Sequence, residues 1–188
     1  MRVPTLILAG LVFFSIAPGA QPAQTSGAPE TFSATAEVKA AAGAITAGIL
    51  VHIQRYTPDF DRTAAEKALA GGGYPAFLTA LRKAPEVGSV AAGEQKVPIR
   101  WAREQKTAGG RTIVVVTDGP LYFVGGGRAA GKSRSGYEVA VVQLRVDDAG
   151  AGTGTMAAAA RVKPGGETGV QIDDYADQPI TLTAVRRK

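Results

Sequence analysis

Apolar and polar residues alternate along most of this chain, in short segments that glycine- and proline-rich turns separate. The alternation is clearest in residues 31–39, 45–56, 111–117 and 137–147. Successive side chains of a strand point to opposite faces of a sheet, so this period of two is typical of strands with one buried face. The close spacing leaves no room for repeated helical crossovers. We therefore expect a mainly β protein, an antiparallel β-barrel or two-sheet sandwich of about eight to nine strands.

Shorter apolar segments supply the remaining strands of this count. Within residues 97–103 the alternation places Val97, Ile99 and Trp101 inward and Arg100 and Ala102 outward. Residues 153–163 contain a run of alanines that favours a helix, but turn residues on both sides favour a hairpin strand, and we predict a strand. The other predicted strands are residues 87–90, 170–175 and 180–185, and a further short apolar run lies at 121–124.

A helical insertion interrupts the strands at residues 62–83. Thr63 and Glu66 have the spacing of a capping box, which would start a first helix, and the three glycines at 71–73 would end it. Pro75 suits the first turn of a second helix, since its missing N–H has no helical partner there. The apolar residues of this pair must cover one end or one side of the sheet.

The chain begins with the features of a secretory signal peptide. Arg2 precedes an apolar run at residues 6–17, and small residues follow at 18–20. The run is too short to span a bilayer comfortably. We expect a signal peptide at 1–20, a disordered tether at 21–30, a single β-rich domain at 31–188, and no membrane span after cleavage. The mature protein would then be periplasmic or secreted.

Composition excludes several kinds of site. The chain has no cysteine, which rules out disulfides, thiolate metal sites and a lipid-modified cysteine. Its 21 Lys and Arg stand against 16 Asp and Glu, a net charge of +5, and these charges are interspersed along the chain. Interspersed charges are typical of a solvated surface, so we expect no nucleic-acid partner.

Residues 126–133 match the phosphate-loop pattern G-x-x-x-x-G-K-S. In that motif the loop opens directly into a helix, whose N-terminus attracts phosphate. Here Gly136 and the strand that starts near Tyr137 follow at once, so we interpret the match as accidental. Arg128 and Lys132 in this loop remain candidates for attracting an anionic group, which requires no helix.

Three further residues are candidates for ligand binding. His52 lies on the polar face of its strand. It is the only histidine, and because there is no second one the chain cannot build a typical zinc site. Trp101 is either a core anchor or a stacking platform in a cavity. Tyr122 lies in the short apolar run before the basic loop. The sequence contains no G-x-S-x-G nucleophile elbow of a serine hydrolase. The acidic pair at Asp173 and Asp174 suits a turn. We expect no metal and no cofactor.

Four segments together resemble an uncharacterised family of small exported bacterial proteins. They are residues 55–59, 73–78, 122–127 and 152–156, and the resemblance covers most of the mature chain. It implies a bacterial envelope or secreted setting and carries no activity, cofactor or site residue.

Three hypotheses of function follow from the sequence. The first is an exported, non-enzymatic β-barrel that binds a small apolar or anionic ligand in its interior, with the helical insertion as lid or plug. The second is a cell-envelope interaction module that binds through loops such as 125–136. The third is an enzyme that uses carboxylates or His52.

Overall fold

The computed structural model describes residues 29–40, 43–122 and 134–188. The predicted signal peptide, most of the tether, and the basic loop with Arg128 and Lys132 lie outside these residues.

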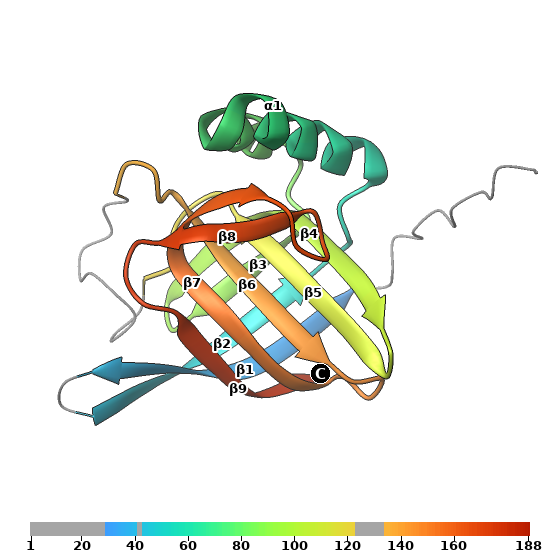
Figure 1. The fold of residues 1–188 in the computed structure, drawn as a ribbon. Coiled ribbons are helices and arrows are strands. Elements are labelled where there is room, and N and C mark those ends of the chain that lie inside the picture. Colours follow the sequence, from blue (N-terminus) through green and yellow to red (C-terminus); the bar gives the residue numbers. More distant parts are fainter. Residues whose placement is uncertain (1–28, 41–42, 123–133) are drawn as a thin grey trace, which may run out of the picture.

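Nine strands and one helix make up the described chain (Figure 1). The first part contains β1 (Glu30–Ala40), β2 (Gly43–Ile53), α1 (Asp59–Lys83), β3 (Gly88–Ala92) and β4 (Gln95–Thr107). The second part contains β5 (Gly110–Thr117), β6 (Val139–Val146), β7 (Ala151–Pro164), β8 (Val170–Tyr175) and β9 (Ile180–Arg187).

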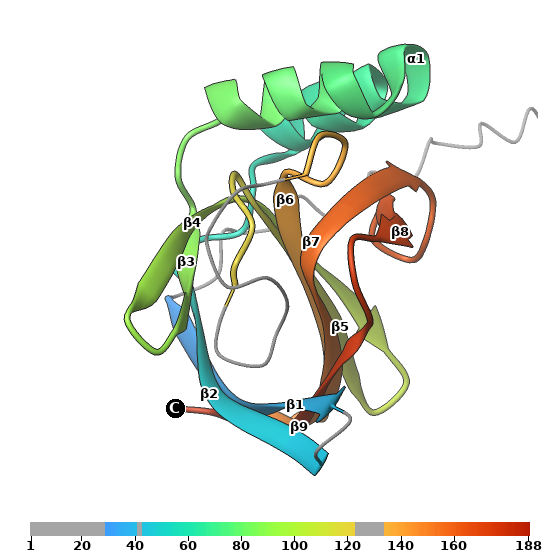
Figure 2. The ribbon, with the colours of Figure 1, turned by 90° about the vertical axis from the view of Figure 1, so that its left-hand side faces the viewer.

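The strands form a closed antiparallel barrel. Their order is β6-β5-β4-β3-β2-β1-β9-β7-β8, and an additional pairing of β6 with β7 closes a ring of eight strands. The ninth strand, β8, pairs with the C-terminal part of β7, from Ala160 to Pro164. Seen nearly along the barrel, the strands enclose an interior and α1 lies outside the ring (Figure 2). The predicted class is confirmed, and of the two alternatives the structure is a barrel.

The first hairpin shows how the alternation sets which residues face inward. Phe32 pairs with Val51 and Ala34 pairs with Ile49. All four side chains are buried, whereas His52, between Val51 and Ile53, is exposed. The prediction that His52 lies on the polar face of its strand is confirmed.

A β-bulge in β4 overturns the predicted orientation of Trp101. Ile99 pairs with Thr117 and Trp101 pairs with Val116, so β4 contains one residue more than β5 at this point. An extra residue reverses the alternation for the rest of the strand. Ala102 consequently joins the apolar interior, and Trp101 faces outward beneath α1.

The helical insertion lies close to its predicted range, but its start differs. α1 begins at Asp59 behind Pro58, with no side-chain cap, so the predicted capping box is wrong and Thr63 lies inside the helix. Glu66 instead forms ion pairs with Arg62 and Arg103. The predicted break is confirmed, because Gly73 has non-helical dihedral angles (φ 66°, ψ −164°).

Two apolar regions lie on opposite sides of the barrel wall. The inner core lies inside the ring, and the outer core lies between the wall and the elements α1 and β8. On β5, Ile113 belongs to the inner core and Val114 to the outer core. Both faces of this part of the wall are therefore buried, which explains the nearly unbroken apolar run of the strand.

The structure describes the chain on either side of the basic loop. Leu121 and Tyr122 are not in a strand, although Leu121 N–H donates to Ala158 O at 2.8 Å. A turn at 134–136 and then β6 follow the loop, so the described residues after it contain no helix of the kind that a phosphate loop requires. Within the described residues no helix has the length and apolarity to cross a membrane.

An ion-pair cluster joins β7 to β8, and we expect it to make stability depend on acid pH. Arg161 Nε donates to Asp173 Oδ2 at 3.0 Å, and Lys163 Nζ lies 3.2 Å from Asp173 Oδ1. The hydrogen bond from Arg161 and that from Lys163 lower the pKa of Asp173, and the hydroxyl of Tyr137 lowers the pKa of Asp174.

Asp173 should contribute stability that disappears in acid. Since its pKa is lower folded than unfolded, the contribution is complete above the unfolded value, about 4, and is lost as pH falls through the folded value. Asp173→Asn should therefore flatten the fall of melting temperature on acidification, measured by thermal unfolding from pH 7 to pH 2. The control, Asp148→Asn on the exposed β6–β7 turn, should keep the wild-type profile. Identical profiles for wild type and Asp173→Asn would contradict the assignment.

Candidate functional site

The interior of the barrel is lined continuously by apolar side chains. All eight ring strands contribute, because each has alternate residues that point inward. The largest inner-core side chains that are fully buried are Phe32, Ile49, Ile53, Ile99, Ile113, Leu121, Leu144, Met156 and Ile180.

Small side chains are frequent in this inner core. Seven of its residues are alanines, and they come from five of the ring strands. An alanine adds only one methyl group to the interior, and an eight-stranded barrel is just wide enough either for side chains to fill it or for one small ligand. The seven are Ala34, Ala36, Ala92, Ala102, Ala140, Ala158 and Ala159.

One end of the interior carries charged side chains. Arg111 Nη1 donates to Glu30 Oε1 at 2.9 Å and to Glu104 Oε2 at 2.7 Å, and Nη2 donates to Glu30 Oε2. These side chains are 14% to 24% exposed, so they lie between the apolar core and solvent. We call Glu30, Glu104 and Arg111 the mouth cluster.

The electrostatics of the mouth cluster keep its arginine charged. Hydrogen bonding to Glu30 is the main cause that raises the pKa of Arg111 above its ordinary value, and the guanidinium also lies 5.8 Å from the ring centre of Phe32. The adjacent Tyr56 is buried, and this burial, together with the charge of Glu30, raises the pKa of its hydroxyl. Arg111 is therefore a cation and Tyr56 a neutral phenol at any physiological pH.

The candidates from the sequence do not meet in one place. Trp101 is completely buried in the outer core, with Phe77 of α1 and Val116 of β5. Tyr122 is buried in the inner core. His52 is exposed on the outside of β2, where its Nδ1 lies 3.0 Å from the hydroxyl oxygen of Thr31.

Arg128 and Lys132 lie outside the described residues. Of the five sequence candidates, Tyr122 alone is described in the interior.

Sequence reasoning missed the mouth cluster, although a signal for it existed. Glu30 precedes inward Phe32 by two residues, and Arg111 precedes inward Ile113 by two residues. Extending each alternation by one step places both charges inside the barrel. The inward position of Glu104 could not be predicted from the alternation, because it depends on the bulge in β4.

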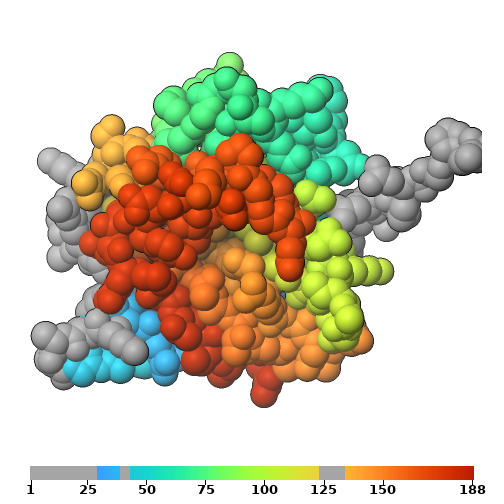
Figure 3. All heavy atoms as spheres, viewed as in Figure 1, coloured from blue at the N-terminus to red at the C-terminus, as the bar shows by residue number. Residues whose placement is uncertain are grey.

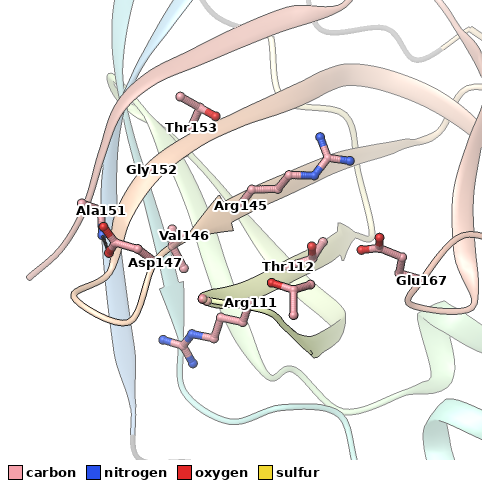
Figure 4. A pocket seen from close by; sticks show the side chains of 12 residues that line it. Arg111, Thr112, Arg145, Val146, Asp147, Ala151, Gly152, Thr153 and Glu167 are labelled. Carbon is pink, nitrogen blue, oxygen red and sulfur yellow. Dashed lines mark hydrogen bonds between the residues drawn. The ribbon is translucent and has the colours of Figure 1, made fainter.

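The outer wall carries two adjoining grooves beneath the β7–β8 hairpin, where the surface is hollowed (Figure 3). Their volumes are about 360 Å³ and 250 Å³, and both are lined by Thr112, Arg145 and Glu167. Arg145 extends to the side of Glu167, whereas Arg111 extends to the opposite side (Figure 4). The grooves therefore open on the outside of the barrel, and Arg111 of the mouth cluster also lines the larger one.

Fold and site together define a closed eight-stranded antiparallel β-barrel with an apolar, alanine-rich interior and a charged cluster at one end. No protein-family model, curated protein or solved structure matches the chain. The resemblance to small exported bacterial proteins stays a prediction.

Proposed function

We propose that this protein binds one small apolar molecule in the interior of its barrel, without catalysis. The observation that carries the proposal is the apolar lining of a closed ring of eight strands, in which seven of the buried inner-core residues are alanine. An apolar ligand there would gain about 25 cal/mol for each Å² of its surface removed from water. If residues 1–20 act as a signal peptide, the protein meets this ligand in the periplasm or outside the cell.

An anionic ligand has less support than an apolar one. Arg111, the described cation of the mouth cluster, is already paired with two carboxylates. A carboxylate or phosphate from a ligand would have to displace one of them. The candidates Arg128 and Lys132 lie outside the described residues.

The two alternative functions stand on weaker observations. For an enzyme, the candidate His52 lies exposed on the outer wall of the barrel. Within the described residues no three His, Cys, Asp or Glu side chains are grouped to hold a metal ion. The outer grooves favour an interaction module of the cell envelope, since they offer a partner both Arg145 and Glu167. They open on the surface in Figure 3, and the apolar lining of the interior suits a small apolar molecule better.

The test measures binding of an uncharged apolar fluorophore, N-phenyl-1-naphthylamine, by its rise in emission. We expect saturable binding at one site per chain. Ala36→Leu, at a completely buried inward position of β1, should weaken it about tenfold or more. Three added carbon atoms occupy ligand volume, and each buried CH₂ of the displaced ligand is worth about 0.8 kcal/mol.

The matched control is Ala70→Leu, the same change at an exposed position of α1, which should bind like wild type. Thermal unfolding would confirm that both variants fold. Native mass spectrometry of protein exported to a bacterial periplasm, followed by solvent extraction, should show an apolar adduct. A bare mass and no fluorophore binding would refute the proposal.

A further inference from the structure

The mouth cluster joins strands from opposite sides of the ring. Around the barrel the order is β6-β5-β4-β3-β2-β1-β9-β7, so β1 and β5 are four strands apart in either direction. Glu30 starts β1 and Arg111 lies at the start of β5. Because the two side chains are nevertheless hydrogen bonded, their ion pair must cross the interior at this end.

Neighbouring side chains extend this crossing into a barrier. Glu104 adds a third strand, β4, to the same guanidinium. Phe32 lies directly behind it on the inner side, with its ring centre 5.8 Å from the guanidinium carbon. A molecule that moves from solvent toward the inner core at this end meets the charged layer first and Phe32 next.

The barrel wall offers no comparable route. Adjacent ring strands are joined by antiparallel pairings all round the ring, from β1 with β2 to β6 with β7 and back through β9 to β1. Passage through the wall requires breaking several hydrogen bonds of such a pairing. Passage through the mouth requires only rotation of long side chains, which takes place far faster than the parting of strands.

We propose that the mouth cluster is the gate of the barrel: the Arg111–Glu30 ion pair holds one end of the interior closed, and its opening admits the ligand. The part that concerns the ligand rests on the proposed function. The closed and open states of the gate exist without a ligand and are measurable alone.

The experiment uses a thiol placed inside the barrel. The chain has no cysteine, so Ala102→Cys puts one thiol at a completely buried inward position two residues from Glu104. Its reaction with methyl methanethiosulfonate, a small uncharged reagent, reports how often the interior opens. Adding Glu30→Gln should accelerate the reaction about tenfold, because the glutamine amide is uncharged and has one accepting oxygen, so the ion pair through both carboxylate oxygens is lost.

Controls separate a gate from general loosening. Ala157→Cys, 1% exposed in the outer core, should react at the same rate with and without Glu30→Gln. Arg145→Gln on the outer wall should leave the inner thiol unchanged. Where Ala102→Cys fails to fold, Ala36→Cys on β1 serves as the inner reporter.

The outcomes decide between the proposals. Faster labelling of the inner thiol alone supports the gate. The gate is refuted if the inner thiol is labelled at the same rate with and without Glu30→Gln, or if Glu30→Gln accelerates the labelling of both thiols. Failure of wild type to bind the fluorophore, together with a bare mass, would refute the proposed function and leave the labelling result intact. If the fluorophore binds, stopped-flow mixing should show about tenfold faster association and dissociation in Glu30→Gln, at nearly unchanged affinity.

Discussion

Trp101→Ala should lower the free energy of unfolding by about 3 to 5 kcal/mol, the usual cost of removing a buried tryptophan. Trp101 has no exposed surface and lies in the outer core, between the barrel wall and α1. Its loss leaves a cavity beneath Leu69, Phe77 and Leu81 of the helix. Urea unfolding followed by circular dichroism would measure the change.

Trp101→Phe separates packing from the polar edge of the ring. The indole Nε1 is buried without a hydrogen-bond partner, so phenylalanine removes an unsatisfied donor along with part of the ring. We expect this variant to lose much less stability than Trp101→Ala and to bind the fluorophore as wild type does. If a stable Trp101→Phe protein lost binding, Trp101 would take part in ligand binding, which would contradict its position in the outer core.

Gly152→Ala should also be severely destabilising, by about 3 kcal/mol or more, at the upper end for overpacking. Gly152 lies in β7 opposite Val146 of β6, in the pairing that closes the ring. A Cβ atom there would lie 1.9 Å from the backbone oxygen of Arg145. Backbone atoms cannot move aside as a side chain can, so the β6–β7 pairing must separate at this point. A lower melting temperature and faster amide hydrogen exchange in β6 would show this separation.

The control for this change is Gly48→Ala in β2. A Cβ at Gly48 meets nothing within 4 Å, so alanine should leave stability within about 1 kcal/mol of wild type or improve it. A Gly152→Ala protein as stable as Gly48→Ala would show that the closing pairing is looser than the structure indicates.

The strand pattern was predictable where one face of a strand is buried and the other is wet. β1 and β2 follow the alternation directly, with Phe32 and Val51 inside and His52 outside. β6 was also predicted, although Val141 and Val142 are both buried, on opposite faces. Its second buried face exists because α1 and β8 cover the wall there, and a strand's own residues do not specify that cover.

The candidate site was less predictable than the fold. The inward positions of Glu30 and Arg111 followed from alternation, but their meeting did not, since 81 residues separate them and only ring closure brings β1 opposite β5. Trp101 was placed on the wrong face because one extra residue in β4 changes the alternation. A bulge depends on how two strands pair, which is a property of the folded sheet.

The sequence by itself determined the class of this protein: antiparallel strands set by a period of two, one helical insertion broken at its glycines, and a chain without cysteine. These are local properties, decided by backbone preferences and by which residues avoid water. Only the tertiary structure decided that the sheet closes into a barrel, that α1 packs on its side, and that Arg111 meets Glu30 across one end. Those outcomes depend on contacts between distant segments, whose free energy exists only once the ring has closed.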